Sequence, residues 1–248
     1  MNIYKNITDI PSFKNPVITI GSFDGVHAGH QKILARVKSL AEEINGESVV
    51  ITFFPHPRKI VDPKEQELSV LNTLDEKIAK ISSLGINNMV IIPFTFEFSR
   101  LSPREYIEKF IIDTFHPKYI VIGYDHKFGL NRAGDITLFK DYEKKGIFQV
   151  IEIPKQEVDE VTVSSTKIRS AIVSGSIEEA NLLLNHPYVL SGKVIHGDKL
   201  GTKLGYPTAN LYISEKEKLI PKEGVYAVQT MIEGEKFDGM MYIGKKPT

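Results

Sequence analysis

One stretch, residues 17–34, reads as a buried strand, a turn rich in glycine and the start of an amphipathic helix. Val17–Ile20 is apolar, and Gly21, Gly25 and Gly29 leave the backbone bare for a ligand or a tight bend. A helix start presents unpaired N–H groups and the positive end of the helix dipole, which suit an anion such as phosphate. The stretch therefore predicts that the first helix begins at a phosphate site.

Two histidines, His27 and His30, stand where this helix begins. Residues three apart share a helix face, so both side chains can donate hydrogen bonds to one phosphate. Such a pair can also bind zinc or do no chemistry, but no Cys, Glu or third His nearby completes a zinc site. We expect a nucleotide-phosphate site suited to nucleotidyl transfer.

Apolar segments and amphipathic helices alternate through the next 130 residues or so, which is typical of a parallel sheet with helices on both faces. Capping boxes predict helices after Thr73 and Ser102, and a further helix is expected around residues 136–144. In such α/β folds, ligands bind beyond the carboxyl ends of the strands. The predicted strands are residues 17–20, 48–54, 89–93, 119–123 and 148–153.

Residues 163–170 place hydroxyl side chains at a predicted helix start and follow them with Lys167 and Arg169. Positive charge in the first turn opposes the helix dipole, so it adds nothing to the stability of the helix. The alternative is an ordinary cap with two solvated bases. Beside the turn of His27 and His30, we favour a second contribution to polyphosphate binding.

The sequence pattern changes near residues 185–188, where helical periodicity is replaced by the pattern of short strands and glycine turns. We expect a strand over 189–196, a glycine-rich loop over 201–211, and a hairpin of 225–232 with 237–243. These elements predict a small antiparallel barrel. The chain is therefore divided into two domains, residues 1–186 and 187–248.

Composition limits the partners. The 31 basic and 31 acidic residues balance, so bulk charge favours neither nucleic acid nor an anionic membrane. The sequence has no cysteine, no signal-peptide pattern and no apolar run long enough to span a bilayer. We expect a cytoplasmic protein.

Seven ordered motifs carry a resemblance to a known family. Four lie in the first domain, at residues 21–30, 52–58, 123–134 and 164–169, and three in the second, at 192–197, 201–211 and 224–228. The chain resembles the bifunctional prokaryotic riboflavin kinase/FAD synthetase family across essentially its whole length. The resemblance implies a Rossmann-like nucleotidyltransferase domain followed by a partial riboflavin kinase β-barrel. It implies AMP transfer from ATP to FMN, giving FAD and pyrophosphate, and phosphorylation of riboflavin by ATP.

The resemblance also implies roles for residues of the first domain. The catalytic group is His27, His30 and Arg169. The implied ATP-binding residues are Gly21, Phe23, Asp24, Gly29, Ser164, Ser165, Thr166 and Lys167. The implied flavin-binding residues are Pro55, His56, Pro57, Arg58, Asp125, His126 and Phe128. Prolines of this kind usually only shape a loop, and Tyr124 and Phe128 can equally belong to the core.

In the second domain, the resemblance implies ATP binding by Gly201, Lys203, Gly205, Thr208 and Asn210, with Mg²⁺ at Thr208 and Asn210. At the first site Mg²⁺ is expected to be held mostly through phosphate oxygens and water. Two positions depart from the family pattern, because His126 replaces a usual phenylalanine and Lys203 a commoner arginine. The sequence also ends before the position of the family's catalytic glutamate, so we expect riboflavin kinase activity to be absent or very weak.

Two other functions remain open. Related folds share the His-x-x-His turn, so the acceptor could be another phosphate compound, such as phosphopantetheine or a sugar alcohol phosphate. The chain could also be a non-catalytic regulatory module that binds flavin or nucleotide. The partners implied by the family resemblance are small molecules, namely ATP, FMN and riboflavin.

Overall fold

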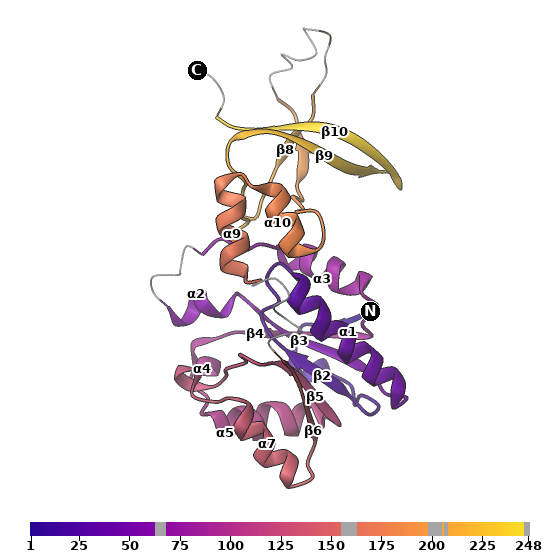
Figure 1. The fold of residues 1–248 in the computed structure, drawn as a ribbon, viewed down its shortest axis with the longest axis vertical. Coiled ribbons are helices and arrows are strands. Elements are labelled where there is room, and N and C mark those ends of the chain that lie inside the picture. Colours follow the sequence, from indigo (N-terminus) through magenta and orange to yellow (C-terminus); the bar gives the residue numbers. More distant parts are fainter. Residues whose placement is uncertain (63–67, 155–162, 198–204, 206–207, 246–248) are drawn as a thin grey trace.

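The computed structural model describes residues 1–62, 68–154, 163–197, 205 and 208–245 of the chain. The molecule is elongated (Figure 1), with a sheet and its helices at one end and two small β-sheets at the other. Helices α9 (Ser165–Ser174) and α10 (Ile177–Leu184) lie between these two ends. Gly201 and Lys203 lie outside the described residues.

The larger sheet has six strands, all parallel, in the order β1-β4-β3-β2-β5-β6. The expected strands are confirmed within one residue at each end. The structure adds β1, a short edge strand that pairs with β4 and that the sequence analysis missed. The bounds are β1 (Asn2–Tyr4), β2 (Val17–Ile20), β3 (Ser48–Phe54), β4 (Asn88–Pro93), β5 (Tyr119–Gly123) and β6 (Gln149–Ile153).

Helices cover both faces of this sheet. Along β4, Val90 and Ile92 pack with side chains of η3 and α7, whereas Met89 and Ile91 pack with side chains of α1 and α3. Successive residues of a strand point to opposite faces, so each face has its own apolar core. The longer helices here are α1 (Ala28–Glu43), α3 (Leu74–Ser83), the π-helical η3 (Tyr106–Ile112) and α7 (Ile136–Lys144). The shorter elements are η1 (Ile7–Asp9), α2 (Pro57–Val61), α4 (Phe96–Ser99), α5 (Pro103–Glu105), α6 (Asp113–Phe115) and η4 (Leu130–Arg132).

Both predicted capping boxes are confirmed. The hydroxyl of Thr73 accepts from the Glu76 N–H while Glu76 accepts from the Thr73 N–H, and Ser102 and Glu105 do the same. The helix after Ser102 differs from the expected regular α-helix, since residues 106–112 are π-helical. Among the described residues, no helix combines the length and the apolar content needed to cross a bilayer.

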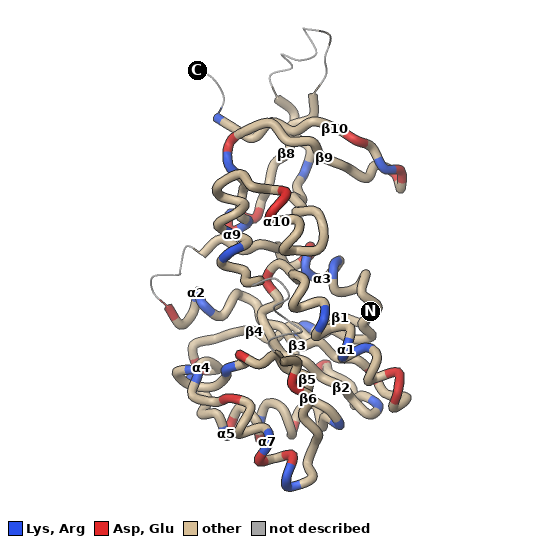
Figure 2. Tube along the Cα trace, in the orientation of Figure 1, with Lys and Arg blue, Asp and Glu red and all other residues tan. Residues whose placement is uncertain are grey.

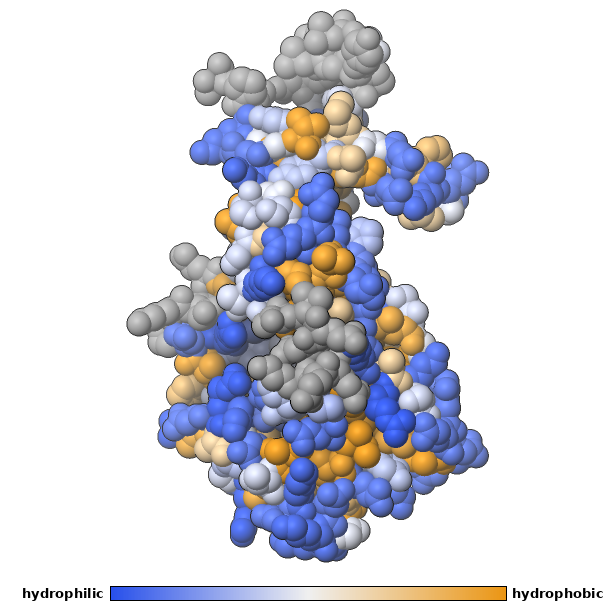
Figure 3. All heavy atoms as spheres, in the orientation of Figure 1, coloured by the Kyte–Doolittle hydropathy of each residue, from blue (hydrophilic) through white to orange (hydrophobic). Residues whose placement is uncertain are grey.

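The C-terminal strands form two separate antiparallel pairs, β7 (Lys193–Ile195) with β8 (Asn210–Tyr212) and β9 (Gly224–Ile232) with β10 (Glu235–Ile243). They agree with a partial barrel, and the hairpin is confirmed. The strand expected over 189–196 is shorter, because only residues 193–195 find partners in β8. Met240 of β10 is 81% exposed. Figure 3 shows apolar side chains on the surface of this end of the molecule. Charges of both signs are mixed along the described residues (Figure 2).

Candidate active site

A cavity of about 930 Å³ opens at the carboxyl ends of the parallel strands. Its walls include residues 19–23, which are the end of β2 and the turn after it, Phe53 of β3, Phe94 after β4, and the segment after Gly123 of β5. Strand β3 pairs with one edge of β2, and the next strands of that half, β4 and β1, lie beyond β3. Strand β5 pairs with the other edge of β2, and β6 lies beyond it. The cavity therefore lies at the point where the strand order reverses, which is where open α/β sheets bind ligands.

His27 is the N-cap residue of α1. Its Nδ1 accepts a hydrogen bond from the His30 N–H at 3.4 Å. Burial lowers the pKa of His27 to about 4, so the ring is neutral at pH 7. A neutral ring whose Nδ1 accepts carries its proton on Nε2. Local capping thus selects the tautomer of His27 and leaves an N–H that can donate.

His30 lines the cavity. Its ring stacks on the ring of His27 and meets the edge of Phe23, with centroids 5.2 Å apart in the second contact. Burial holds the pKa of His30 well below its usual value, and repulsion from His27, when that ring is protonated, and from the Lys77 ammonium acts in the same direction. Its Nδ1 is buried without a hydrogen-bond partner among the described residues. Buried polar atoms are normally paired, so the unpaired nitrogen makes His30 a candidate ligand-binding residue.

The turn before α1 is held in an unusual backbone conformation. Phe23 has φ +47° and Val26 has φ +41°, which lie in the left-handed region that residues other than glycine rarely adopt. At Gly25, φ is +85°, and a Cβ there would lie 2.7 Å from Cδ1 of Leu71. Only glycine fits this position, because both the conformation and the space exclude a side chain.

Asp24 lies behind the cavity and does not line it. One carboxylate oxygen accepts from the backbone N–H groups of Leu71 and Asn72, at 2.9 and 3.3 Å. The other contacts the Nη2 of Arg169 in a buried ion pair. The hydroxyl of Ser165 donates to the Asp24 carbonyl at 3.0 Å. The start of α9 is thus joined to the turn before α1, and Arg169 reaches the cavity wall from there.

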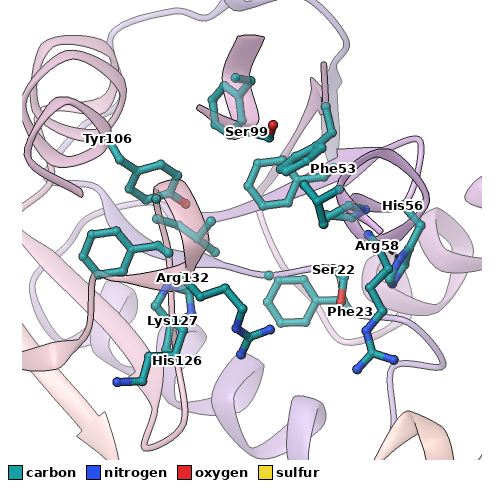
Figure 4. A pocket seen from close by; sticks show the side chains of 18 of the residues that line it. Ser22, Phe23, Phe53, His56, Arg58, Ser99, Tyr106, His126, Lys127 and Arg132 are labelled. Carbon is teal, nitrogen blue, oxygen red and sulfur yellow. Dashed lines mark hydrogen bonds between the residues drawn. The ribbon is translucent and has the colours of Figure 1, made fainter. Parts of the chain in front are cut away.

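Charge in the cavity is unlike charge in the whole chain. Its described lining has five basic side chains and two acidic ones, although the sequence balances 31 of each. Figure 4 shows basic side chains on two opposite sides of the cavity. Clustered charge of one sign concentrates ligands of the other sign. The basic residues are Arg58, Arg100, Lys127, Arg132 and Arg169, and the acidic ones are Asp62 and Asp125.

The proline turn leads into α2 rather than ending in a loop. The Phe54–Pro55 peptide bond is cis, and Nδ1 of His56 accepts from the Arg58 N–H to cap the helix. Burial, with the positive charges of Lys77 and Arg169 next in size, lowers the pKa of His56 to about 3. His56 is therefore neutral at pH 7, like the pair at α1.

Aromatic rings form another wall of the cavity. Phe128 stacks on Tyr106 with centroids 5.0 Å apart, and the His126 ring lies 5.9 Å from Phe128. Figure 4 shows Tyr106 and Phe53 projecting from separate elements towards the same space. A wall of this kind suits the flat ring of a heteroaromatic ligand. Phe128 is at once part of the core and part of the cavity lining.

The structure brings 11 of the 18 site residues predicted in the first domain to one cavity. Those that line it are Gly21, Phe23, His30, His56, Pro57, Arg58, Asp125, His126, Phe128, Ser165 and Arg169. Those that do not are Asp24, His27, Gly29, Pro55, Ser164, Thr166 and Lys167. Thr166 and Lys167 are exposed at the start of α9, and Ser164 caps that helix. Gly205, Thr208 and Asn210 are exposed in the C-terminal region and also lie outside the lining.

Lys77 is not among the site residues predicted from the sequence. This side chain is buried, and its Nζ donates to the carbonyl of Ser22 at 2.7 Å. Burial lowers its pKa to about 8, against an opposite influence of Asp24. Its burial could have been inferred from helical spacing. Lys77 lies four residues before Ile81, and Ile81 belongs to the apolar face of the same helix.

The fold and the cavity define a nucleotide-binding α/β protein of the nucleotidyltransferase type. The FAD synthetase family model matches residues 9–167, and the riboflavin kinase family model matches residues 184–248. The chain belongs to the family of bifunctional riboflavin kinase/FMN adenylyltransferases.

Individual relatives agree. The bifunctional enzyme of Listeria monocytogenes is 40% identical over 230 residues, which are 93% of this chain and 72% of the relative. That of Bacillus subtilis is 36% identical over 94% of this chain and 72% of its own length. A solved structure titled "Macrolide-efflux Protein" from Streptococcus pneumoniae superposes with a TM-score of 0.87. It is 32% identical, and the match covers 99% of this chain and 79% of that one.

Proposed function

We propose that this chain transfers AMP from ATP to FMN and thereby forms FAD and pyrophosphate. One observation carries the proposal. His30 lines the cavity where the first helix starts, five basic side chains line the same cavity, and the buried Nδ1 of His30 has no hydrogen-bond partner among the described residues. The activity named by the curated relatives agrees with such a cavity for a nucleotide and a flavin.

The reaction requires positioning and charge stabilisation rather than a protein nucleophile. A phosphate oxygen of FMN attacks the α-phosphorus of ATP, and the new P–O bond replaces the bond to the bridging β-phosphate oxygen. Pyrophosphate leaves with the electron pair of the broken bond. Negative charge builds on the phosphoryl oxygens in the transition state, so fixed donors aimed at those oxygens lower the barrier.

The neutral histidines suit this task. A neutral imidazole keeps one N–H, so each ring can donate one hydrogen bond to a phosphoryl oxygen, and in His27 that donor is Nε2–H. Arg169 is held by Asp24, so its guanidinium is fixed before the substrate binds. We assign the triphosphate to the side of the cavity formed by the α1 and α9 starts, and the flavin to the side lined by Phe128 and Tyr106.

Magnesium is the metal that the family implies. The described residues contain no group of three His, Cys, Asp or Glu side chains arranged to hold a metal ion. Mg²⁺ prefers oxygen ligands and keeps several waters, so phosphate oxygens can supply most of its contacts. The oxygen-bearing side chains of Thr208 and Asn210, both exposed, fit the same preference. We propose that the ion reaches the first site with ATP and offsets the charge of its phosphates.

The two-domain division at residues 186 and 187, the cytoplasmic location and the weakness of the riboflavin kinase activity stay predictions. The same holds for the kinase residues Gly205, Thr208 and Asn210 and for their undescribed neighbours Gly201 and Lys203. Riboflavin and FMN are different acceptors, so the kinase activity can be tested separately from AMP transfer.

The test is an acceptor series. The chain is mixed with ATP, Mg²⁺ and one of FMN, riboflavin or phosphopantetheine, and pyrophosphate and products are measured. FAD and pyrophosphate formed one for one from FMN support the proposal. Pyrophosphate only with phosphopantetheine assigns a different acceptor, and tight binding of FMN and ATP without pyrophosphate indicates a regulatory module. Prompt phosphorylation of riboflavin contradicts the expectation of a weak kinase.

A further inference from the structure

A buried ion pair joins the two family-matched regions. Nζ of Lys218 lies 2.6 Å from Oε2 of Glu76, and the exposed fractions of the two side chains are 0% and 5%. The same Nζ donates to the Leu71 carbonyl at 2.7 Å and lies 4.2 Å above the ring of Tyr188. Lys218 and Tyr188 belong to the riboflavin kinase match, and Glu76 and Leu71 to the FAD synthetase match.

Glu76 is itself fixed from several directions. Its Oε2 accepts from the Thr73 N–H in the capping box of α3, and its Oε1 accepts from the Ser191 N–H at 3.0 Å. A buried carboxylate that is paired and fully hydrogen-bonded has little freedom to follow a displaced partner. Lys218 is therefore anchored to the rigid start of a helix.

The backbone beside Lys218 pairs with the backbone beside Leu71. The Val70 N–H donates to the Glu217 carbonyl at 2.7 Å, and the Leu219 N–H donates to the Val70 carbonyl at 3.0 Å. Val70 and Lys218 thus form a parallel β-bridge. Residues 69–72 are held by residues 217–219 through both backbone and side chain.

The opposite side of residues 69–72 holds the ion pair of the active site. The Leu71 and Asn72 N–H groups donate to Oδ1 of Asp24, and the Ser69 carbonyl accepts from Nε of Arg169 at 2.8 Å. Asp24 and Arg169 also contact each other. Four consecutive backbone residues therefore connect Lys218 on one side with Arg169 on the other.

We propose that Lys218, in the riboflavin kinase region, is a positioning residue for AMP transfer in the FAD synthetase region. It fixes the Leu71 carbonyl and hence the backbone groups that hold Asp24 and Arg169, which sets where the guanidinium meets the triphosphate. This inference rests on the proposed function. It assigns to the second region a part in the first reaction that does not involve the kinase site.

Lys218→Met removes the charge and keeps an apolar chain of similar length. We expect kcat/KM for AMP transfer to fall about 10- to 100-fold, since small displacements of positioned groups cost that much. The matched control is Phe115→Leu, a buried change in the core on the other side of the sheet. We expect it to lower the thermal midpoint but to leave kcat/KM within about twofold of wild type.

A double-mutant cycle with Arg169→Lys separates positioning from general destabilisation. If Lys218 acts through Arg169, the double variant is no slower than the slower single variant, because both changes remove one arrangement. Multiplying effects, or a Lys218→Met chain with wild-type kcat/KM, overturn the proposal. Assays are run where circular dichroism shows each variant folded.

The Lys218→Met chain can fail to fold, and the wild-type chain can fail to form FAD. If Lys218→Met does not fold, the Glu76→Gln/Lys218→Met variant takes its place, since removing both charges avoids an unpaired buried carboxylate. It is expected to fold and to show the same loss of kcat/KM, and wild-type activity in it overturns the proposal. If the wild-type chain itself forms no FAD, the proposed function is wrong. If the wild type forms FAD and the Lys218 variant is equally active, only the positioning role of Lys218 is wrong.

Discussion

The imidazole rings of His27 and His30 are stacked, with centroids 3.6 Å apart and planes 16° from parallel. The arrangement follows from the N-cap, since the His30 N–H donates to Nδ1 of His27 and brings one ring over the other. Both rings are neutral at pH 7, so stacking carries no charge repulsion. One backbone hydrogen bond thus positions two side chains that are candidates for binding phosphate.

His30→Gln keeps a polar side chain but removes the ring. We expect kcat to fall about 100-fold or more, as when one donor to a developing oxyanion is removed. Because the ring packs on His27 and Phe23, the thermal midpoint should fall modestly, by about 2–4 °C for each kcal/mol lost. Steady-state kinetics and calorimetry on the same preparation check both. A large stability loss with normal turnover would make His30 a core residue only.

His27 can be divided into its two roles. His27→Ala loses the cap and should lower the free energy of unfolding by about 1 kcal/mol, whereas His27→Asn restores a good N-cap. If Nε2–H binds phosphate, both variants lose turnover although only the alanine variant loses stability. An asparagine variant with wild-type turnover would reduce His27 to a cap.

Gly25→Ala tests the turn beneath the site. The left-handed conformation costs about 1–2 kcal/mol with a Cβ, and the overlap with Leu71 adds about 1–3 kcal/mol. Gly146→Ala is the matched control, because Gly146 has φ +72° but no atom within 4 Å of the position that a Cβ would take. Urea unfolding should show a clearly larger loss for Gly25→Ala. Equal losses would mean that the turn can open without cost.

His126 makes stability depend on pH. Burial, with the charge of Arg132 second, lowers its pKa to about 4, and its Nε2 is enclosed without a partner among the described residues. The unfolded chain binds a proton near pH 6.5 and the folded chain does not, so stability falls as the pH drops from about 6.5 to about 4.

His126→Phe removes this titration. The wild-type free energy of unfolding should fall relative to the variant by up to about 3 kcal/mol over that range, at about 1.4 kcal/mol per pKa unit. Urea unfolding at several pH values measures the difference. Parallel pH curves for the two proteins would show that the ring is protonated equally in both states.

The elements with strong local signals were predictable from sequence. The strand, turn and helix at residues 17–43 follow from apolar periodicity and glycine placement, and Thr73 and Ser102 announce their helices through capping boxes. Strand β1 was not predicted, because its three residues, with Ile3 exposed, show no hydrophobic periodicity. Only pairing with β4 makes them a strand.

The candidate site was predictable as a set of motifs but not as a geometry. Asp24 carries no sign in the sequence that it would hold Arg169 from behind rather than face the ligand, because 145 residues separate them. Lys218 stands in a charged run that reads as solvated surface, yet Glu76 makes its burial possible. Contacts between distant segments decide such positions, and local pattern does not report them.

The most direct test of the account follows a label from ATP. ATP labelled at the α-phosphorus or at the γ-phosphorus is mixed with FMN and the wild-type chain, and the flavin product is isolated. Attack at the α-phosphorus predicts label in FAD from the α-labelled ATP only, with the γ-label recovered in pyrophosphate. Label in a flavin product from the γ-position, or FAD free of the α-label, would contradict the account.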